Sequence, residues 1–175
     1  MIMKNNNIQH STAYNTIINE LDTRCNQLHQ THQAHTRCRK GCSQCCMDFS
    51  VLPVEFYSIL AAIKNNPPIQ LNEHEGCIFL VDHACTIYEH RPSICRSHGL
   101  PILNMDAEGE NWELSFCPLN FTKVDDDYFS LDNGFQQDVF NSKLYLANRE
   151  FVSEFKENKF SENELIELRK LKEYF

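Results

Sequence analysis

Regular hydrophobic spacing first becomes visible between residues 11 and 37. Apolar or weakly polar side chains recur there at steps of three and four, which predicts one long helix with a single buried face: Tyr14, Ile18, Leu21, Cys25, Leu28, His32 and His35. Cys25 lies on this face, so we expect it to be a small core residue. The histidines at 29, 32 and 35 drift around a helix, which favours a polar or partly buried helix end over a metal site.

Proline, glycine and a capping motif mark further helices. Pro53 suits the first turn of a helix that continues to about Lys64. Pro92 can open a short helix that Gly99 ends. Two more helices are predicted over residues 135–155 and 161–175, and the second begins with the capping box Ser161-x-x-Glu164.

Two segments read as β-hairpins. Residues 77–88 alternate around a three-residue turn, Asp-His-Ala, with a cysteine at the start of each strand. Residues 100–116 form the second candidate. The predicted fold is therefore mainly α with small β-hairpins, an α+β arrangement in one domain over residues 1–175.

In this prediction, a cysteine-rich middle region stapled by metal is flanked by N- and C-terminal helices. The flanking helices carry apolar stripes that we expect to bury against each other or against a partner. The stripes consist of Ile18, Leu21 and Leu28 on one side and of Phe140, Leu144, Phe151 and Phe155 on the other.

Net charge and hydropathy limit which kinds of partner and which cellular compartment we expect. The net charge of −8 disfavours nucleic acid, which requires a basic footprint. No apolar run approaches the roughly 20 residues of a membrane span, and residues 1–15 lack the apolar core of a secretory signal. We therefore expect a cytoplasmic protein with reduced thiols. The sequence leaves a protein partner or substrate open.

Nine cysteines need an explanation in a reducing compartment. An odd count fits poorly with a closed disulfide framework, and buried structural cysteines would be scattered with the core. Eight of the nine instead cluster in predicted loops and turns, which favours metal ligation over disulfides or plain burial. The candidate ligands are Cys38, Cys42, Cys45, Cys46, Cys77, Cys85, Cys95 and Cys117.

The same cysteines carry a family resemblance. Cys38-x₃-Cys42-x₂-Cys45-Cys46, then Cys77, Cys85, the run IYEHRPSICR and a final Cys-Pro resemble the YkgJ-type cysteine-cluster proteins, described as zinc- or iron-chelating CxxCxxCC domains. Flagellin lysine methylases contain a similar cysteine region. The resemblance covers about residues 38–119. The first spacer here has three residues instead of two, and His98 stands where an aromatic residue is expected. The resemblance implies ligands rather than a reaction.

The number and identity of the metals stay open at this level. Four thiolates suit one Zn²⁺ or one [4Fe–4S] cluster, and we favour iron, including iron–sulfur, over zinc. The side chains of adjacent Cys45 and Cys46 tend to diverge, so they serve two centres more easily, or one of them ligates while the other packs. Eight thiols thus suit two Cys₄ sites or one multinuclear cluster. Arg91 and Arg96 flank Cys95 and are candidates for partial charge compensation.

Two classes of function follow. The first is a metal-binding protein whose centre is structural, regulatory or used in metal handling. The alternative is an iron- or iron–sulfur-dependent enzyme of redox or group-transfer type, such as a protein-modifying enzyme, which would keep an open coordination position. His83, His90 and His98 lie near the ligands and are candidates to complete such a site. The C-x₃-C-x₂-C spacing also occurs in radical S-adenosylmethionine enzymes, but their large α/β barrel does not fit 175 residues.

Overall fold

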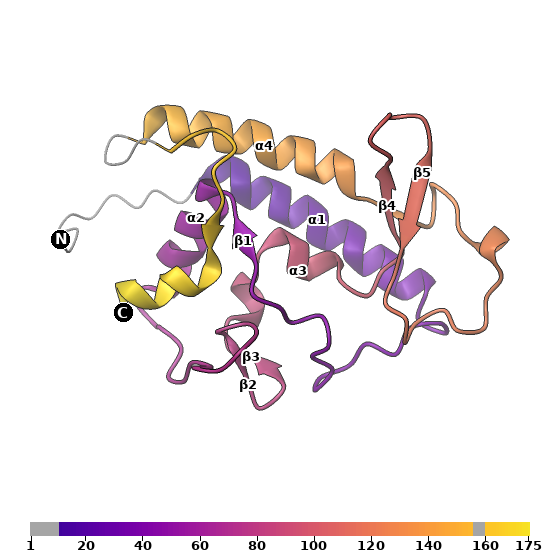
Figure 1. Cartoon of the computed structure of the whole chain (residues 1–175), viewed down its shortest axis with the longest axis horizontal. Coiled ribbons are helices and arrows are strands. Elements are labelled where there is room, and N and C mark those ends of the chain that lie inside the picture. Colours follow the sequence, from indigo (N-terminus) through magenta and orange to yellow (C-terminus); the bar gives the residue numbers. More distant parts are fainter. Residues whose placement is uncertain (1–10, 156–159) are drawn as a thin grey trace.

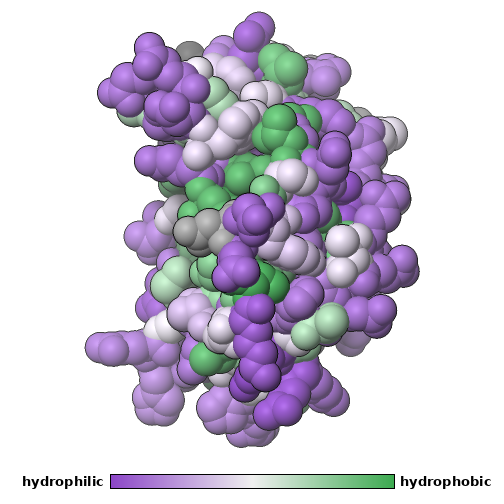
Figure 2. Space-filling model, turned by 90° about the vertical axis from the view of Figure 1, so that its right-hand side faces the viewer, coloured by the Kyte–Doolittle hydropathy of each residue, from purple (hydrophilic) through white to green (hydrophobic). Residues whose placement is uncertain are grey.

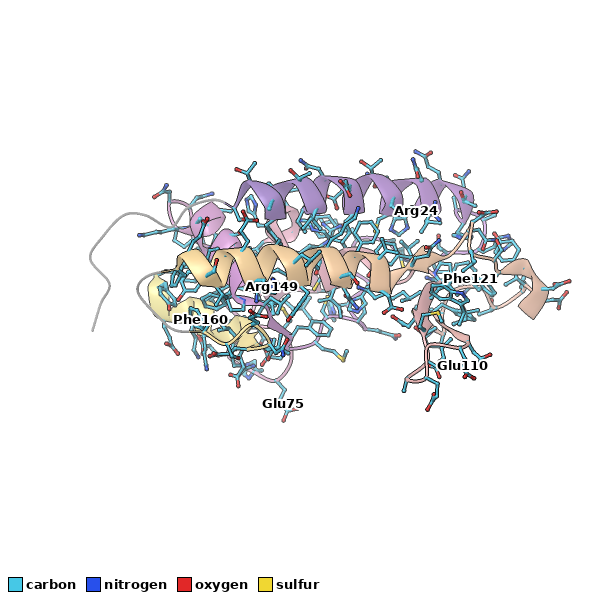
Figure 3. All side chains as sticks on the ribbon, turned by 90° about the horizontal axis from the view of Figure 1, so that it is seen from above. Arg24, Glu75, Glu110, Phe121, Arg149 and Phe160 are labelled. Atoms are coloured by element: carbon cyan, nitrogen blue, oxygen red, sulfur yellow. The ribbon has the colours of Figure 1, made fainter. Side chains whose placement is uncertain are left out.

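Two long antiparallel helices are the main structural elements of the fold. The computed structural model describes residues 11–155 and 160–175, so the expectation about a signal segment in residues 1–15 falls mostly outside the described residues. Helix α1 (Thr12–Thr31) and helix α4 (Gln137–Glu154) lie side by side and run in opposite directions (Figures 1 and 3). Helix α2 (Pro53–Ile63) packs against both, and the short helix α3 (Ser93–Ser97) packs against α1.

The strands are short and form three small sheets. β1 (Ser50–Val51) pairs antiparallel with β7 (Ile166–Glu167), and β2 (Leu80–Val81) pairs antiparallel with β3 (Ala84–Cys85). In the third sheet, β4 (Ile102–Met105) lies between β5 (Trp112–Ser115), which is antiparallel to it, and β6 (Phe135–Gln136), which is parallel. Three 3₁₀ helices complete the fold: η1 (Tyr88–His90), η2 (Asp126–Tyr128) and η3 (Leu168–Tyr174). The predicted class, mainly α with small hairpins, is confirmed.

The predicted stripes on the flanking helices meet each other. One apolar cluster joins Ile18, Leu21 and Leu28 of α1 to Phe140 and Leu144 of α4, with Phe151 packed against it. A second cluster lies between α2, the segment that precedes β2, and the C-terminal residues; Phe155 packs there. Cys25 is 3% exposed and belongs to the first cluster, as its position on the helix face predicts.

Helix α1 ends at Thr31, so the predicted extension to residue 37 is wrong. His32, which follows the helix, is held by tertiary contacts on both ring nitrogens: Nε2 lies 2.7 Å from the carbonyl oxygen of Asn133, and Nδ1 lies 2.9 Å from the hydroxyl of Tyr128. The next residues form turns, because the amides of His35 and Thr36 both donate to the His32 carbonyl. These contacts commit His32 to a packing role. In the part of the chain that the structure describes, it belongs to no metal-binding group.

The helices predicted around α2 and α4 are largely confirmed. Pro53 stands in the first turn of α2, and the amide of Val54 finds an acceptor in the side chain of Asn148 at 3.0 Å. This bond ties the start of α2 to α4 and satisfies a donor that has no partner within its own helix. Residues 135 and 136 belong to strand β6 rather than to the helix.

The predicted C-terminal helix over residues 161–175 is wrong. Half of its capping box forms, since the carboxylate of Glu164 accepts from the amide of Ser161 at 3.2 Å. The chain then enters strand β7 and the 3₁₀ helix η3. Tertiary packing overrides the local signal there: Ile166 pairs with Val51, and Leu168 is buried in the second core cluster.

The hairpin over residues 77–88 exists, but its details differ from the prediction. The turn has two residues, Asp82 and His83, both with positive φ (49° and 59°), which is typical of a type I′ turn. Cys77 precedes β2 by three residues, and Cys85 ends β3 rather than starting it. The hairpin over residues 100–116 is confirmed as β4 and β5.

The surface at the β4–β5 end is mixed. Figure 2 views this end and shows hydrophobic side chains set among hydrophilic ones. Trp112, Leu114 and Phe116 each expose between a third and a half of their side chains. Among the helices of the described residues, none combines the length and the apolar character of a membrane span.

Candidate metal centre

Two consecutive turns arrange the first four clustered cysteines. The amide of Cys42 donates to the carbonyl of Arg39 at 3.0 Å, and Gly41 between them has a φ of 92°, as the third position of a type II turn requires. The amide of Cys46 closes the next turn onto the carbonyl of Ser43 at 3.0 Å. In Figure 1 this loop, from the end of α1 to β1, passes along the lower edge of the molecule.

Cys38 and Cys117 are joined through Asn120. The side-chain amide of Asn120 donates to Cys38 Sγ at 3.3 Å and to the carbonyl of Gly99 at 2.7 Å, while its carbonyl oxygen accepts from the amide of Arg37 at 2.8 Å. The backbone amide of Asn120 in turn bonds the carbonyl of Cys117 at 2.9 Å. A Cβ at Gly99 would lie 2.5 Å from Cys38 Sγ, so this close approach requires glycine.

Asn120 was not among the residues predicted for the site. It is 1% exposed, and its side chain makes three hydrogen bonds to two distant segments, at residues 37–38 and at Gly99. The sequence signal is weak: an asparagine three residues after a cysteine is also ordinary turn chemistry. Its role depends on long-range neighbours that a local pattern does not reveal.

The thiols of Cys38, Cys42 and Cys117 act electrostatically on that of Cys45. Burial raises the pKa of Cys45 most, its own backbone amide opposes that shift, and these three neighbouring thiols raise the pKa further. We call Cys38, Cys42, Cys45 and Cys117 the outer set. Cys38 is its exposed member, and the other three are partly buried.

The remaining four thiols gather around the β2–β3 hairpin. Leu80, which pairs with Cys85, donates its amide to the carbonyl of Cys77 at 3.0 Å. The Cys46 carbonyl lies beside Gly76, where an added Cβ would be 3.7 Å from that oxygen. We call Cys46, Cys77, Cys85 and Cys95 the inner set.

Electrostatics within the inner set agree with this grouping. Burial raises the pKa of Cys46 to about 11, and Cys45, Cys77 and Cys85 add to the shift. The pKa of Cys95 is raised far above its ordinary value, first by burial and then by Cys77, Cys85, Cys46 and Cys45 in decreasing order. On this basis we group the eight predicted ligands into two neighbouring sets of four, and Cys45 also acts on Cys46 and Cys95 across the boundary between the sets.

The inner set is held by residues from three distant segments. The carboxylate of Glu55 in α2 accepts from the amide of Ser93 at 2.9 Å, which fixes the start of the short helix that carries Cys95. Arg96, in the same helix, is 7% exposed and pairs with Asp22 of α1 at 2.5 Å. Arg169 of η3 forms an ion pair with Asp48 and donates to the carbonyl of Gly76 at 3.2 Å.

The two arginines near Cys95, Arg91 and Arg96, have different contacts. Arg91 lies over the ring of Tyr88 at 3.8 Å and lowers the pKa of Cys85, opposing the larger effect of burial. Arg96 points to Asp22 and to the backbone carbonyls of Arg91 and Glu89, so its contacts serve the fold.

Among the histidines, His83 Nδ1 lies 3.0 Å from the Ser43 hydroxyl, which ties the hairpin turn to the cysteine loop. Burial lowers the pKa of His98, whose ring packs 5.4 Å from that of Phe49. His90 ends η1 and is exposed.

The donor chemistry fits zinc or iron, since soft thiolates suit both metals and each set supplies four. Within residues 11–155 and 160–175, however, no group of three or more cysteine, histidine, aspartate or glutamate side chains is already arranged to hold an ion. The loops that carry the thiols would therefore have to move for a set to hold an ion. Such a site couples metal binding to local ordering of the loops.

Comparison with known proteins identifies the middle segment. No curated protein and no solved structure matches the chain. A family model described as "CxxCxxCC: Putative zinc- or iron-chelating domain" matches residues 37–118. The match contains all eight cysteines of the two sets, and its bounds agree with the 38–119 predicted from the sequence. The segment that carries both sets is therefore similar to the CxxCxxCC family of zinc- or iron-chelating domains.

Proposed function

We propose that the chain binds metal at two centres, one in the outer set and one in the inner set, each through four thiolates. The observation that carries this proposal is that hydrogen bonds through Asn120 join Cys38 to Cys117, while Leu80 joins Cys77 to Cys85 at the β2–β3 hairpin. The causes of the raised pKa values of Cys45 and Cys95 are consistent with this grouping. The family description supports it, since it names chelation of zinc or iron and no reaction. When bound, the metals would cross-link the loop at 38–46 to the β2–β3 hairpin, to α3 and to the end of β5.

A reducing compartment such as the cytoplasm suits this function. All nine cysteines are free thiols in the structure, and thiolates remain available as ligands only where disulfides do not form. Polar and basic residues surround the outer set, and apolar core residues pack against Cys77 and Cys85 of the inner set. The centres would serve stability, regulation or metal handling.

The test is anaerobic reconstitution followed by metal analysis of the wild type and of two matched variants. We expect Cys42→Ser to remove the outer metal and Cys85→Ser to remove the inner one, each leaving about half of the wild-type content. Visible absorption distinguishes an iron–sulfur centre from colourless zinc. If either variant loses all the metal, one multinuclear cluster is present instead of two centres. A folded wild-type protein that takes up no zinc or iron contradicts the proposal.

A further inference from the structure

The two sets differ in their surroundings. Cys77 and Cys85 of the inner set pack against the second core cluster, which consists of buried apolar side chains from α2, the β2 region and the C-terminal segment. Cys95 lies within α3, which Glu55 and Arg96 fasten to α2 and α1. The four inner cysteines are partly buried, and none of them is among the residues that line the cavity at the outer set.

The outer set instead borders an open cavity of about 1030 Å³. Nine consecutive residues, 36–44, line it together with His83 and Leu119, and the thiol-bearing residues Cys38 and Cys42 are among them. Cys38 is exposed. The hydrogen bond between His83 Nδ1 and the Ser43 hydroxyl holds the hairpin turn at the side of this cavity.

The charge of the cavity is opposite to that of the chain. The protein carries a net charge of −8, yet the charged residues lining the cavity are Arg37, Arg39 and Lys40, and the lining contains no aspartate or glutamate. A concave site with charges of one sign concentrates the field and attracts ions of the opposite sign. An anionic ligand would therefore reach the two outer thiols that face the cavity more easily than a neutral one.

We propose that the outer centre exchanges its metal with small carboxylate-bearing chelates that enter this basic cavity, while the inner centre retains its metal. This inference rests on the proposed function, since it requires two centres. The exchange is a ligand substitution: each metal–sulfur bond that breaks is replaced by a metal–oxygen or metal–nitrogen bond to the chelate. The freed thiolates take up protons from solvent, and no electrons are transferred.

The experiment starts from protein loaded with two equivalents of Zn²⁺. It is challenged separately with nitrilotriacetate, which is a tricarboxylate, and with neutral 1,10-phenanthroline. Zinc that remains after rapid desalting is measured over time, and alkylation with peptide mass spectrometry identifies the cysteines that are freed. We expect one equivalent to leave quickly, freeing the outer set (Cys38, Cys42, Cys45 and Cys117) for alkylation. The second should leave slowly and free the inner set (Cys46, Cys77, Cys85 and Cys95).

Charge variants test the role of the cavity. Arg39→Gln combined with Lys40→Gln should slow the fast phase about 3–10-fold with nitrilotriacetate at low salt and leave phenanthroline unaffected. The turn at 39–42 depends on the Arg39 carbonyl and on Gly41 rather than on these side chains, so the fold should tolerate both changes. The matched control neutralises two exposed lysines of η3 that do not line the cavity, Lys170→Gln with Lys172→Gln, and should leave both rates unchanged.

The possible outcomes are distinct. Release of both metals in one phase, release from the inner set first, or equal slowing with both chelators would overturn the inference while two-site binding stands. Slowing by the control variant as much as by the cavity variant would also overturn it. A protein that binds at most one zinc contradicts the proposed function itself.

Discussion

The side chain of Asn120 holds the thiol of Cys38, with its amide nitrogen 3.3 Å from Sγ. The same side chain bonds the backbone at Gly99 and Arg37 and is almost fully buried. It therefore fixes Cys38, the most exposed thiol, against the turn that follows α3. An amide donor also favours a thiolate over a thiol, because the hydrogen bond is stronger to the charged form.

Replacing Asn120 should weaken the outer centre. Asn120→Asp keeps the shape and the acceptor for Arg37 but places a carboxylate beside the Cys38 thiolate and the Gly99 carbonyl. We expect outer-set zinc affinity to fall about tenfold or more, since a like charge at this distance costs more than 1.4 kcal/mol. Competitive titration measures this change.

The matched control is Asn148→Asp, which alters a fully buried asparagine that joins α2 to α4. It should lower stability by about 1–3 kcal/mol and leave the ratio of outer to inner affinities unchanged. Equal effects of the two variants on that ratio would show that Asn120 acts only through general stability.

Glu55 predicts a pH dependence of stability. Burial raises the pKa of its carboxyl, and the hydrogen bond from the Ser93 amide opposes that shift only partly. Because the folded pKa lies above the unfolded one, stability from the protonated carboxyl is fully present below the unfolded pKa and is lost as pH rises through the folded pKa. Glu55→Gln stays neutral, so the wild type should lose stability relative to this variant as pH rises from 4 to 7.

Urea denaturation of both proteins at matched metal content measures this difference. Glu150→Gln, at an exposed position of α4, is the control and should show a constant offset across the same range. A constant offset for Glu55→Gln as well would mean that the carboxyl titrates normally in the folded protein.

Cys25 should be dispensable for metal. Burial raises the pKa of its thiol to about 12, and it lies in the first core cluster, so it remains a protonated apolar group at neutral pH. Cys25→Ala should cost roughly 1–2 kcal/mol as a small buried truncation and keep the full metal stoichiometry. Elemental analysis beside Cys42→Ala, which should lose metal, makes the comparison. Loss of metal from Cys25→Ala would show that the assignment of ligands is wrong.

Metal removal should loosen the middle of the chain in a graded way. After chelation under reducing conditions, we expect amide exchange to rise across residues 76–118 while much of α1 and α4 stays protected. Within this segment the β2–β3 hairpin should lose most protection, because α3 keeps the Arg96–Asp22 and Glu55–Ser93 contacts. Hydrogen exchange of holo and apo protein measures the pattern. Unchanged exchange in the hairpin would indicate a peripheral site, and uniform loss would indicate that the helices also need metal.

Local sequence patterns were sufficient where a helix has one buried apolar face or where a proline marks its first turn. The spacing of Tyr14, Ile18 and Leu21 identified the buried side of α1, and Pro53 marked the start of α2. The helix predicted after Ser161 does not form. The pairing of Ile166 with Val51 and the burial of Leu168 outweigh the local capping signal.

The sequence likewise predicted the cysteine site only in part. Their spacing and number indicated ligands, and the family match covers them. The sequence allowed two Cys₄ sites but could not assign the cysteines to them, because the assignment depends on where the hairpin, α3 and the end of β5 lie relative to the loop at 38–46. The clamp of Asn120 on Cys38 is invisible for the same reason: its partners lie 82 and 21 positions away.

The pairing of β1 with β7 has a consequence for biosynthesis. Val51 directly follows the cysteine loop, and its partner Ile166 is translated more than a hundred residues later. At about 5–20 residues per second, the ribosome reaches Ile166 roughly 6–23 s after Val51. Four of the eight thiols are already present when Val51 is made, and the other four are added during this interval. Strand β7 and the Arg169–Asp48 ion pair are still missing throughout it. The cysteines of a nascent chain would thus be available to bind metal before β7 and Arg169 hold the loop at 38–46 in place.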